Sequence, residues 1–243
     1  MLKHEGHSGF GLNINLEDQT VTKWTQGSES HKVLLQSYKK QLVAGIDETL
    51  YPLKVVDVIS FKKDRDYFEF TMPFISFETG FTTKNHELVS RLVTQSLTIR
   101  SKVEVFGFCR IMREFIQSLK QSPETAELLQ EASSLNATYP YGHTHGDMGF
   151  ANMLVSHDSV YMIDFTTSFL HSPLLDIATM RLSLASPHAE KWHRDLYESL
   201  VAGHFKKYKQ HINLICKALI LSYAKDSMTD ERSKELLDWY RGF

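Results

Sequence analysis

At positions 143–155 the chain reads HTHGDMGFANMLV, and at positions 161–165 it reads YMIDF. Three side chains with oxygen atoms stand out in these stretches: Asp147, Asn152 five positions later, and Asp164 at the end of a short apolar run. Metal-assisted phosphoryl transfer needs one carboxylate that orients or deprotonates a hydroxyl and two oxygen groups that face the metal. The residue types and their order are therefore suited to that chemistry.

A short hairpin is expected around these residues. The apolar runs 153–155 and 160–163 flank the polar sequence SHDS at 156–159, which is typical of two strands joined by a turn. Packing of the apolar side chains would hold the polar ends together at one edge of a cleft.

In combination, these motifs resemble the catalytic and metal-binding segments of the aminoglycoside phosphotransferase and choline kinase type of small-molecule kinase, relatives of the protein kinases. The resemblance is strong over residues 141–180 and topological elsewhere. It implies that Asp147 is the catalytic base or hydroxyl-orienting residue, and that Asn152 and Asp164 hold Mg²⁺ against the nucleotide phosphates. It also implies that His145 supports the catalytic loop.

The same resemblance implies a lysine that reaches the α and β phosphates of the nucleotide. Lys23 lies in the expected strand 21–25 and is the candidate. The preceding stretch GHSGFG at 6–11 contains Gly9 and Gly11, and glycine allows backbone amides to approach an anion closely. We therefore expect these glycines in a turn that covers the phosphates, although a plain flexible terminus is the alternative.

The resemblance also implies two further carboxylates, one that pairs with the lysine and one that supports the catalytic loop. A partner for Lys23 is expected from the helix 28–44, where Glu29 lies near the start and the deeper Gln36 carries no charge. Asp176 matches an aspartate that, by the resemblance, supports the catalytic loop, although an acidic residue in the first turn of a helix also complements the helix dipole.

Periodicity predicts an α+β chain with a strand-rich part at residues 1–73 and a mainly helical part at 74–243. The resemblance implies that these parts are the small antiparallel-sheet lobe and the helical lobe of a protein-kinase-like, two-lobed fold. The expected strands are 10–16, 21–25, 54–60 and 67–72, and the expected helices are 28–44, 87–100, 103–121 and 124–134, with helices again from 173.

The composition of the chain limits the classes of binding partner that we expect. The 243 residues carry 27 basic and 29 acidic side chains, so the near-neutral charge does not favour nucleic acid or a polybasic membrane patch. Cys109 and Cys216 have no metal-binding spacing, and the apolar run 212–224 is too short to span a bilayer. We expect a cytoplasmic protein whose oligomeric state stays open.

The predicted activity is transfer of the γ-phosphoryl group of ATP or GTP, with Mg²⁺, to a hydroxyl of an aminoglycoside, an amino alcohol or a sugar. Only eleven residues separate Asp164 from Asp176, which leaves no room for the peptide-binding platform of protein kinases. Two alternatives stay open: a zinc or iron hydrolase that uses the HxHxD cluster of His143, His145 and Asp147, and a kinase-like binding module without turnover.

Overall fold

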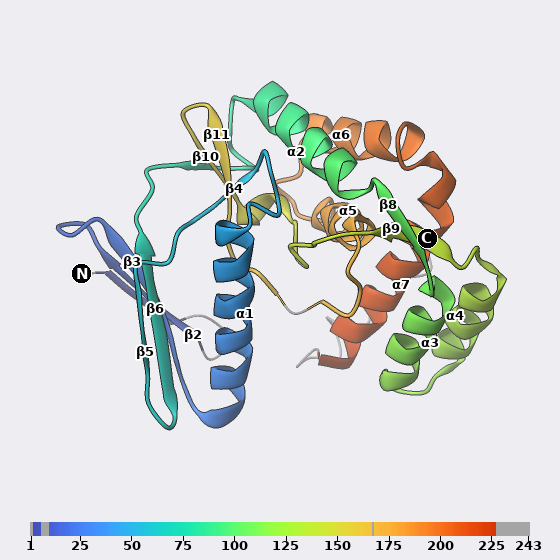
Figure 1. The fold of residues 1–243 in the computed structure, drawn as a ribbon, viewed down its shortest axis with the longest axis horizontal. Coiled ribbons are helices and arrows are strands. Elements are labelled where there is room, and N and C mark those ends of the chain that lie inside the picture. Colours follow the sequence, from blue (N-terminus) through green and yellow to red (C-terminus); the bar gives the residue numbers. More distant parts are fainter. Residues whose placement is uncertain (1, 6–9, 167, 227–243) are drawn as a thin grey trace. The chain divides into compact units, whose positions relative to one another are not determined.

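The computed structural model describes residues 2–5, 10–166 and 168–226, coloured along the chain in Figure 1. Contacts divide these residues into two compact units. The first is formed by the described parts of Met1–Ser96 and His145–Ser168, and the second by those of Leu97–Thr144 and Phe169–Phe243. This division differs from the expected lobes 1–73 and 74–243, because the hairpin with the site residues belongs to the first unit. The functional assignment of the lobes stays a prediction.

The first unit contains an antiparallel five-stranded sheet of order β1-β2-β3-β6-β5. Its strands are β1 (Leu2–Glu5), β2 (Phe10–Asn15), β3 (Thr20–Gln26), β5 (Ser60–Lys63) and β6 (Tyr67–Pro73). Helix α1 (Ser28–Ile46) packs against β3 and β6 (Figure 1). The core here joins Leu34 and Tyr38 of α1 to Phe68, Phe70 and Met72, because alternate residues of β6 face inward.

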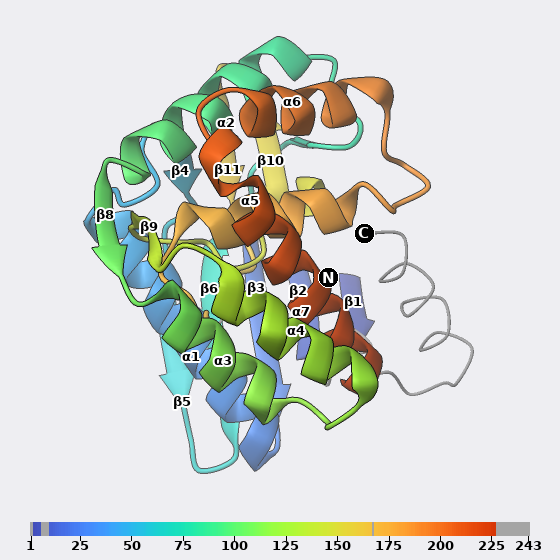
Figure 2. The same ribbon diagram turned by 90° about the vertical axis from the view of Figure 1, so that its right-hand side faces the viewer.

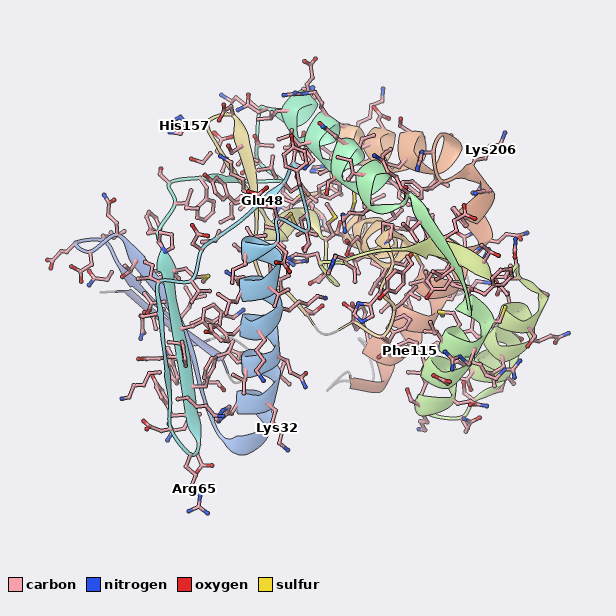
Figure 3. The ribbon with its side chains drawn as sticks, viewed as in Figure 1. Lys32, Glu48, Arg65, Phe115, His157 and Lys206 are labelled. Atoms are coloured by element: carbon pink, nitrogen blue, oxygen red, sulfur yellow. The ribbon has the colours of Figure 1, made fainter. Side chains whose placement is uncertain are left out.

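The expected strand 54–60 is wrong. Only its ends are extended: β4 (Lys54–Val55) belongs to a second sheet, residues 56–59 form no strand, and β5 begins at Ser60 and continues to Lys63. β5 is an edge strand whose four residues are all exposed, so it shows no alternation of apolar and polar side chains. Figure 3 shows Arg65 projecting from the tip of the β5–β6 hairpin.

The second sheet of the first unit has the order β4-β11-β10-β7. Its other strands are β7 (Glu78–Thr79), β10 (Met153–Ser156) and β11 (Ser159–Met162), and helix α2 (His86–Arg100) follows β7 in the sequence. β10 and β11 pair with Met153 opposite Met162. The predicted hairpin is therefore confirmed, and its apolar side chains at Met153, Val155, Val160 and Met162 are buried.

The second unit pairs β8 (Val103–Phe106) with β9 (Thr138–Tyr141) and is otherwise helical. Its helices are α3 (Phe108–Ser118), α4 (Pro123–Ser134), α5 (Pro173–Ser183), α6 (Lys191–Ala202) and α7 (Lys209–Asp226), with a short 3₁₀ turn, η2 (Lys206–Tyr208). Figure 2 shows α3, α4 and α7 side by side, and α7 also packs against the almost fully buried α5.

The single expected helix 103–121 is wrong at its start. Its first residues form β8, and Gly107, with φ of 122°, separates that strand from α3. The later residues are helical as expected, and Phe108, Met112 and Ile116 of α3 are buried on one face of that helix. Among the described helices, none is both long and apolar enough to cross a bilayer.

Candidate active site

A cavity of about 240 Å³ in the first unit is lined by four of the predicted site residues: Lys23, Asp147, Asn152 and Asp164. These residues are as far as 141 positions apart in the sequence. The remaining lining consists of Phe10 of β2, Val33, Leu34 and Ser37 of α1, and Phe165 and Thr166 after β11. The cavity thus combines an apolar wall with a cation, two carboxylates and an amide.

Asp147 and Asn152 are held together by a short 3₁₀ turn, η1 (Phe150–Asn152). The Asn152 Nδ2 donates to the backbone oxygen of Asp147 at 2.9 Å and to its Oδ2 at 3.0 Å. The backbone oxygen of Asn152 accepts from Ile163 at 3.1 Å, which joins the turn to the end of β11. Among the described residues no donor contacts the Asn152 Oδ1, so this oxygen is the one available to a cation.

Asp164 directly follows Ile163 in the sequence and has a positive φ of 61°. This conformation is uncommon for residues other than glycine and is tolerated best by aspartate and asparagine. Its carboxylate forms an ion pair with the Lys23 ammonium. The unusual backbone conformation therefore occurs at the residue whose side chain lines the cavity.

Lys23 lies in β3, and its side chain is 16% exposed. Its ammonium is 5.9 Å from the centre of the Phe10 ring. Among the described side chains of α1, no acidic partner for Lys23 is found: the residues that line the cavity are Val33, Leu34 and Ser37, and Gln36 is exposed. The Glu29 side chain lies outside the described residues. Asp164 takes the place of the expected partner.

His145 is fully buried and supports the loop before Asp147. Its Nδ1 accepts a hydrogen bond from the Asp147 backbone N–H at 3.3 Å, and its ring lies 4.3 Å from the Phe165 ring. The His145 backbone oxygen accepts from the Thr166 N–H at 3.4 Å. His145 therefore contacts both the residue predicted to act as base and the segment that carries Asp164.

Lys40 of α1 joins the same two segments. Its ammonium donates to the backbone oxygens of His145 at 3.0 Å and Thr166 at 2.7 Å, and to the Ser168 hydroxyl. A charged donor strengthens hydrogen bonds to carbonyl oxygens. One side chain thus fixes the loop before Asp147 against the loop after Asp164.

Gly146 makes this close approach possible. Its φ is 92°, and a Cβ atom at this position would lie 2.7 Å from the Thr166 Oγ1 and 2.8 Å from the Ser168 Oγ. Any other residue would be strained in the backbone and crowded by the neighbouring segment. The glycine of the motif is needed here for loop packing.

In the second unit, Asp176 is fully buried in the first turn of α5. It forms an ion pair with Arg100 at 2.5 Å and accepts from the Thr144 hydroxyl at 2.6 Å. Arg100 also donates to the His143 backbone oxygen at 2.8 Å. Asp176 thus stabilises residues 143 and 144, directly before His145 in the sequence, and its role as a positioning residue stays a prediction.

Gly9 lies outside the described residues. Gly11 is in β2 opposite Trp24 of β3, and a Cβ atom there would lie 2.0 Å from the Trp24 ring. Its lack of a side chain accommodates this tryptophan, and a role in covering phosphates stays a prediction.

Among the described residues, no metal-binding cluster supports the hydrolase interpretation of the HxHxD motif. Within the described ranges, no group of three or more His, Cys, Asp or Glu side chains lies close enough to hold a metal ion. His143 is exposed, and His145 is buried against Phe165. The oxygen donors Asn152 and Asp164 instead fit Mg²⁺, which prefers carboxylate and amide oxygens and retains several water ligands.

Solved structures of small-molecule kinases share this fold. A thermostable mutant of aminoglycoside phosphotransferase APH(4)-Ia, in ternary complex with ADP and hygromycin B, matches with a TM-score of 0.68 and 11% identity over 99% of this chain and 90% of that one. A fructosamine-3-kinase-like protein from Haemophilus somnus 129PT matches with a TM-score of 0.65 and 11% identity over 99% and 91%. Spectinomycin phosphotransferase APH(9)-Ia, in complex with ADP and spectinomycin, matches at 0.55 and 12% over 99% and 88%.

The chain therefore has the α+β fold of these kinases, and the resemblance expected from the sequence is confirmed at the level of the fold. No family model and no curated protein matches the sequence.

Two residues of the site escaped prediction. Ser37 lines the cavity, and Lys40 contacts the loops beside it. They lie three positions apart on α1, so helical periodicity places them on one face. Nothing in the sequence distinguishes Lys40 from the solvent-exposed lysines of the same helix, such as Lys39.

Proposed function

We propose that this protein transfers the γ-phosphoryl group of ATP or GTP to a hydroxyl of a small molecule. The observation that carries this proposal is the single cavity that gathers Lys23, Asp147, Asn152 and Asp164. The same fold occurs in aminoglycoside phosphotransferases crystallised with ADP or AMP-PNP, which supports a nucleotide as co-substrate.

Four polar residues of the cavity have roles in this reaction: Lys23, Asp147, Asn152 and Asp164. Asp147 accepts a hydrogen bond from the acceptor hydroxyl and orients its oxygen towards the γ-phosphorus. Lys23 places a positive charge beside the phosphates. Asn152 and Asp164 would hold Mg²⁺, which neutralises phosphate charge when it is bound.

The reaction needs little covalent participation by the protein. The bond between the γ-phosphorus and the bridging oxygen breaks, a bond to the acceptor oxygen forms, and the hydroxyl proton passes to Asp147. Holding the acceptor oxygen in line with the γ-phosphorus and the bridging oxygen supplies much of the rate enhancement. The loop contacts of His145 and Lys40 serve this purpose by fixing the position of Asp147 relative to Asp164.

The acceptor is proposed to be a small molecule. The eleven residues between Asp164 and Asp176 are too few for an ordered segment that lays a peptide beside Asp147. Aminoglycosides, amino alcohols and sugars are the acceptor classes to test. The solved structures of this fold include complexes with hygromycin B and spectinomycin.

The test is a transfer assay with γ-labelled ATP and, separately, GTP, over a panel of hydroxylated metabolites and generic peptides. We expect a low-molecular-weight alcohol to be labelled and peptides to show background only. Asp147→Asn should retain nucleotide affinity and lose roughly two to four orders of magnitude in transfer rate. The matched control is Asp158→Asn, which changes an exposed aspartate in the β10–β11 turn.

Near-normal transfer by Asp147→Asn would remove Asp147 from the mechanism. Nucleotide binding without labelling of any acceptor would favour the binding-module alternative. Stoichiometric zinc or iron that is lost on His145→Ala would favour the hydrolase.

A further inference from the structure

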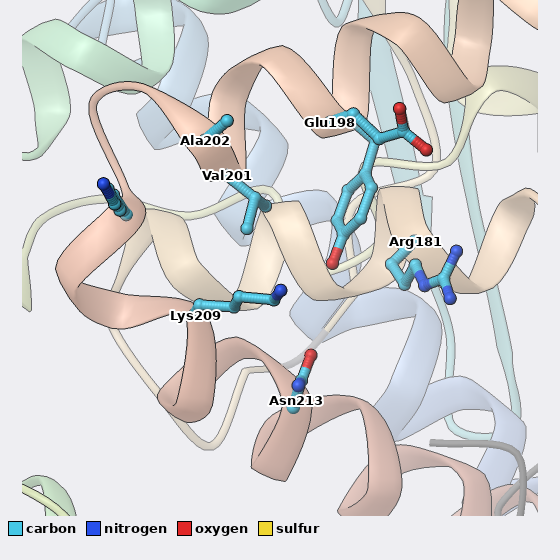
Figure 4. A pocket seen from close by; sticks show the side chains of 8 residues that line it. Arg181, Glu198, Val201, Ala202, Lys209 and Asn213 are labelled. Carbon is cyan, nitrogen blue, oxygen red and sulfur yellow. The ribbon is translucent and has the colours of Figure 1, made fainter.

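A larger cavity, of about 620 Å³, lies in the second unit between α5, α6, η2 and the start of α7 (Figure 4). Its volume falls in the range of small-molecule sites. The polar side chains that line it are Arg181, Tyr197, Glu198, Lys206, Lys209 and Asn213. Three cations against one carboxylate give this groove an excess of positive charge.

Three side chains of the groove, those of Lys206, Lys209 and Asn213, have no polar partner among the described residues. In the part of the chain that the structure describes, neither Lys206 nor Lys209 forms an ion pair, and the Asn213 side chain makes no hydrogen bond. Neighbouring lysines differ, because Lys207 pairs with Glu104 and Lys217 pairs with Glu131 at 2.9 Å. In Figure 4 the Lys209 and Asn213 side chains extend from α7 into the same space.

Tyr197 adds a phenol to this wall. Its side chain is only 8% exposed, and its ring lies 5.2 Å from the Arg181 guanidinium carbon. No described residue accepts a hydrogen bond from its hydroxyl. Burial raises the pKa of Tyr197 to about 12, so the phenol keeps its proton at neutral pH.

We propose that this groove binds a small molecule through a phosphate monoester group. The wall offers two ammonium groups, a phenol and an amide, and an anion with several acceptor oxygens satisfies such donors together. The ammonium groups of Lys206 and Lys209 supply two positive charges for a dianionic phosphate monoester. This binding does not depend on the transfer reaction proposed for the first unit.

Isothermal titration of the full chain with glycerol phosphate tests the proposal, with glycerol and citrate titrated at the same ionic strength. We expect saturable binding of glycerol phosphate, no binding of glycerol, and weaker binding of citrate. Lys209→Gln and Tyr197→Phe should each weaken the affinity by about tenfold, the scale of one hydrogen bond to a charged group. Lys120→Gln, an exposed lysine of the same unit outside the groove, should leave the affinity unchanged.

Tyr197→Phe keeps the ring and removes only the oxygen, so it tests the contact without opening the core. Thermal unfolding of each variant shows whether it is folded. The proposal is overturned if glycerol phosphate does not bind, if citrate binds as tightly, or if folded Lys209→Gln and Tyr197→Phe bind like the unaltered protein. Loss of binding in Lys23→Ala instead would place the phosphate in the cavity of the first unit and also overturn it.

Discussion

The Lys23 ammonium forms an ion pair with the Asp164 carboxylate, although 141 positions separate the two residues. Both groups line the cavity of the first unit, where the lysine is proposed to contact phosphate and the aspartate to hold Mg²⁺. The pair therefore balances the lysine charge in the protein without ligand. If the proposed function holds, nucleotide and metal compete with this existing contact.

Lys23→Ala should weaken ATP binding by about tenfold, because one charged donor to phosphate is lost. The stability of the fold should change little, since the aliphatic stem contributes modest packing. A fluorescent-nucleotide titration measures the affinity. Lys63→Ala, an exposed lysine on the edge strand of the same sheet, is the control. Equal nucleotide affinity in both variants would show that Lys23 does not contact the phosphates.

Asp164→Ala should abolish the Mg²⁺ dependence of nucleotide binding, because the carboxylate is the charged member of the proposed oxygen pair. The nucleotide affinity is measured with Mg²⁺ and with EDTA. In the unaltered protein EDTA should weaken binding, whereas in Asp164→Ala the two affinities should be equal. A variant that still responds fully to Mg²⁺ would show that the metal is held elsewhere.

The sequence predicted the site better than the path of the chain around it. Asp147, Asn152 and Asp164 were found because local features of the sequence mark them: a glycine-flanked loop, a turn, and a hairpin of two short apolar runs. The structure brings all three to one cavity. Their roles are untested.

The errors have physical causes. The edge strand β5 is exposed on every residue, so no periodicity marks it. The partner of Lys23 was sought on the nearby helix, whereas Asp164 arrives from a distant segment through tertiary packing. Lys40 was missed because its acceptors are backbone oxygens, which have no signature in a sequence.

Acid should destabilise the second unit through His211. Its ring is buried beside Phe108, and its Nε2 donates a hydrogen bond to the Asn136 backbone oxygen at 2.8 Å. Burial lowers the pKa of His211 below its usual 6.5. The unfolded chain therefore binds a proton first, so this stabilisation is present above about pH 6.5 and is lost as the pH falls below it.

The melting temperature measured between pH 7.5 and 5.5 checks this expectation. His211→Gln removes the titrating ring and should give a flatter decline with acid than the unaltered protein. His157→Asn changes an exposed histidine in the β10–β11 turn, which Figure 3 shows projecting outwards, and should leave the slope unchanged. A slope in His211→Gln as steep as in the unaltered protein would contradict the assignment.

Lys40 should act on transfer by positioning, since its ammonium contacts the backbone of both loops of the candidate site. Lys40→Met keeps the length of the side chain and removes the charge and the donors. We expect kcat to fall by about one to two orders of magnitude with a smaller change in the KM for nucleotide, because a displaced Asp147 harms the transition state more than binding. Lys39→Met, which changes an exposed lysine of the same helix, is the control.

Rescue separates positioning from stability. Lys40→Arg retains a charged donor that can reach carbonyl oxygens, so it should recover part of kcat even if its melting temperature is as low as that of Lys40→Met. A purely structural role predicts the reverse, with activity following the melting temperature across the three variants. Unchanged kcat in folded Lys40→Met would show that the contacts of His145 and Gly146 are sufficient to fix the two loops.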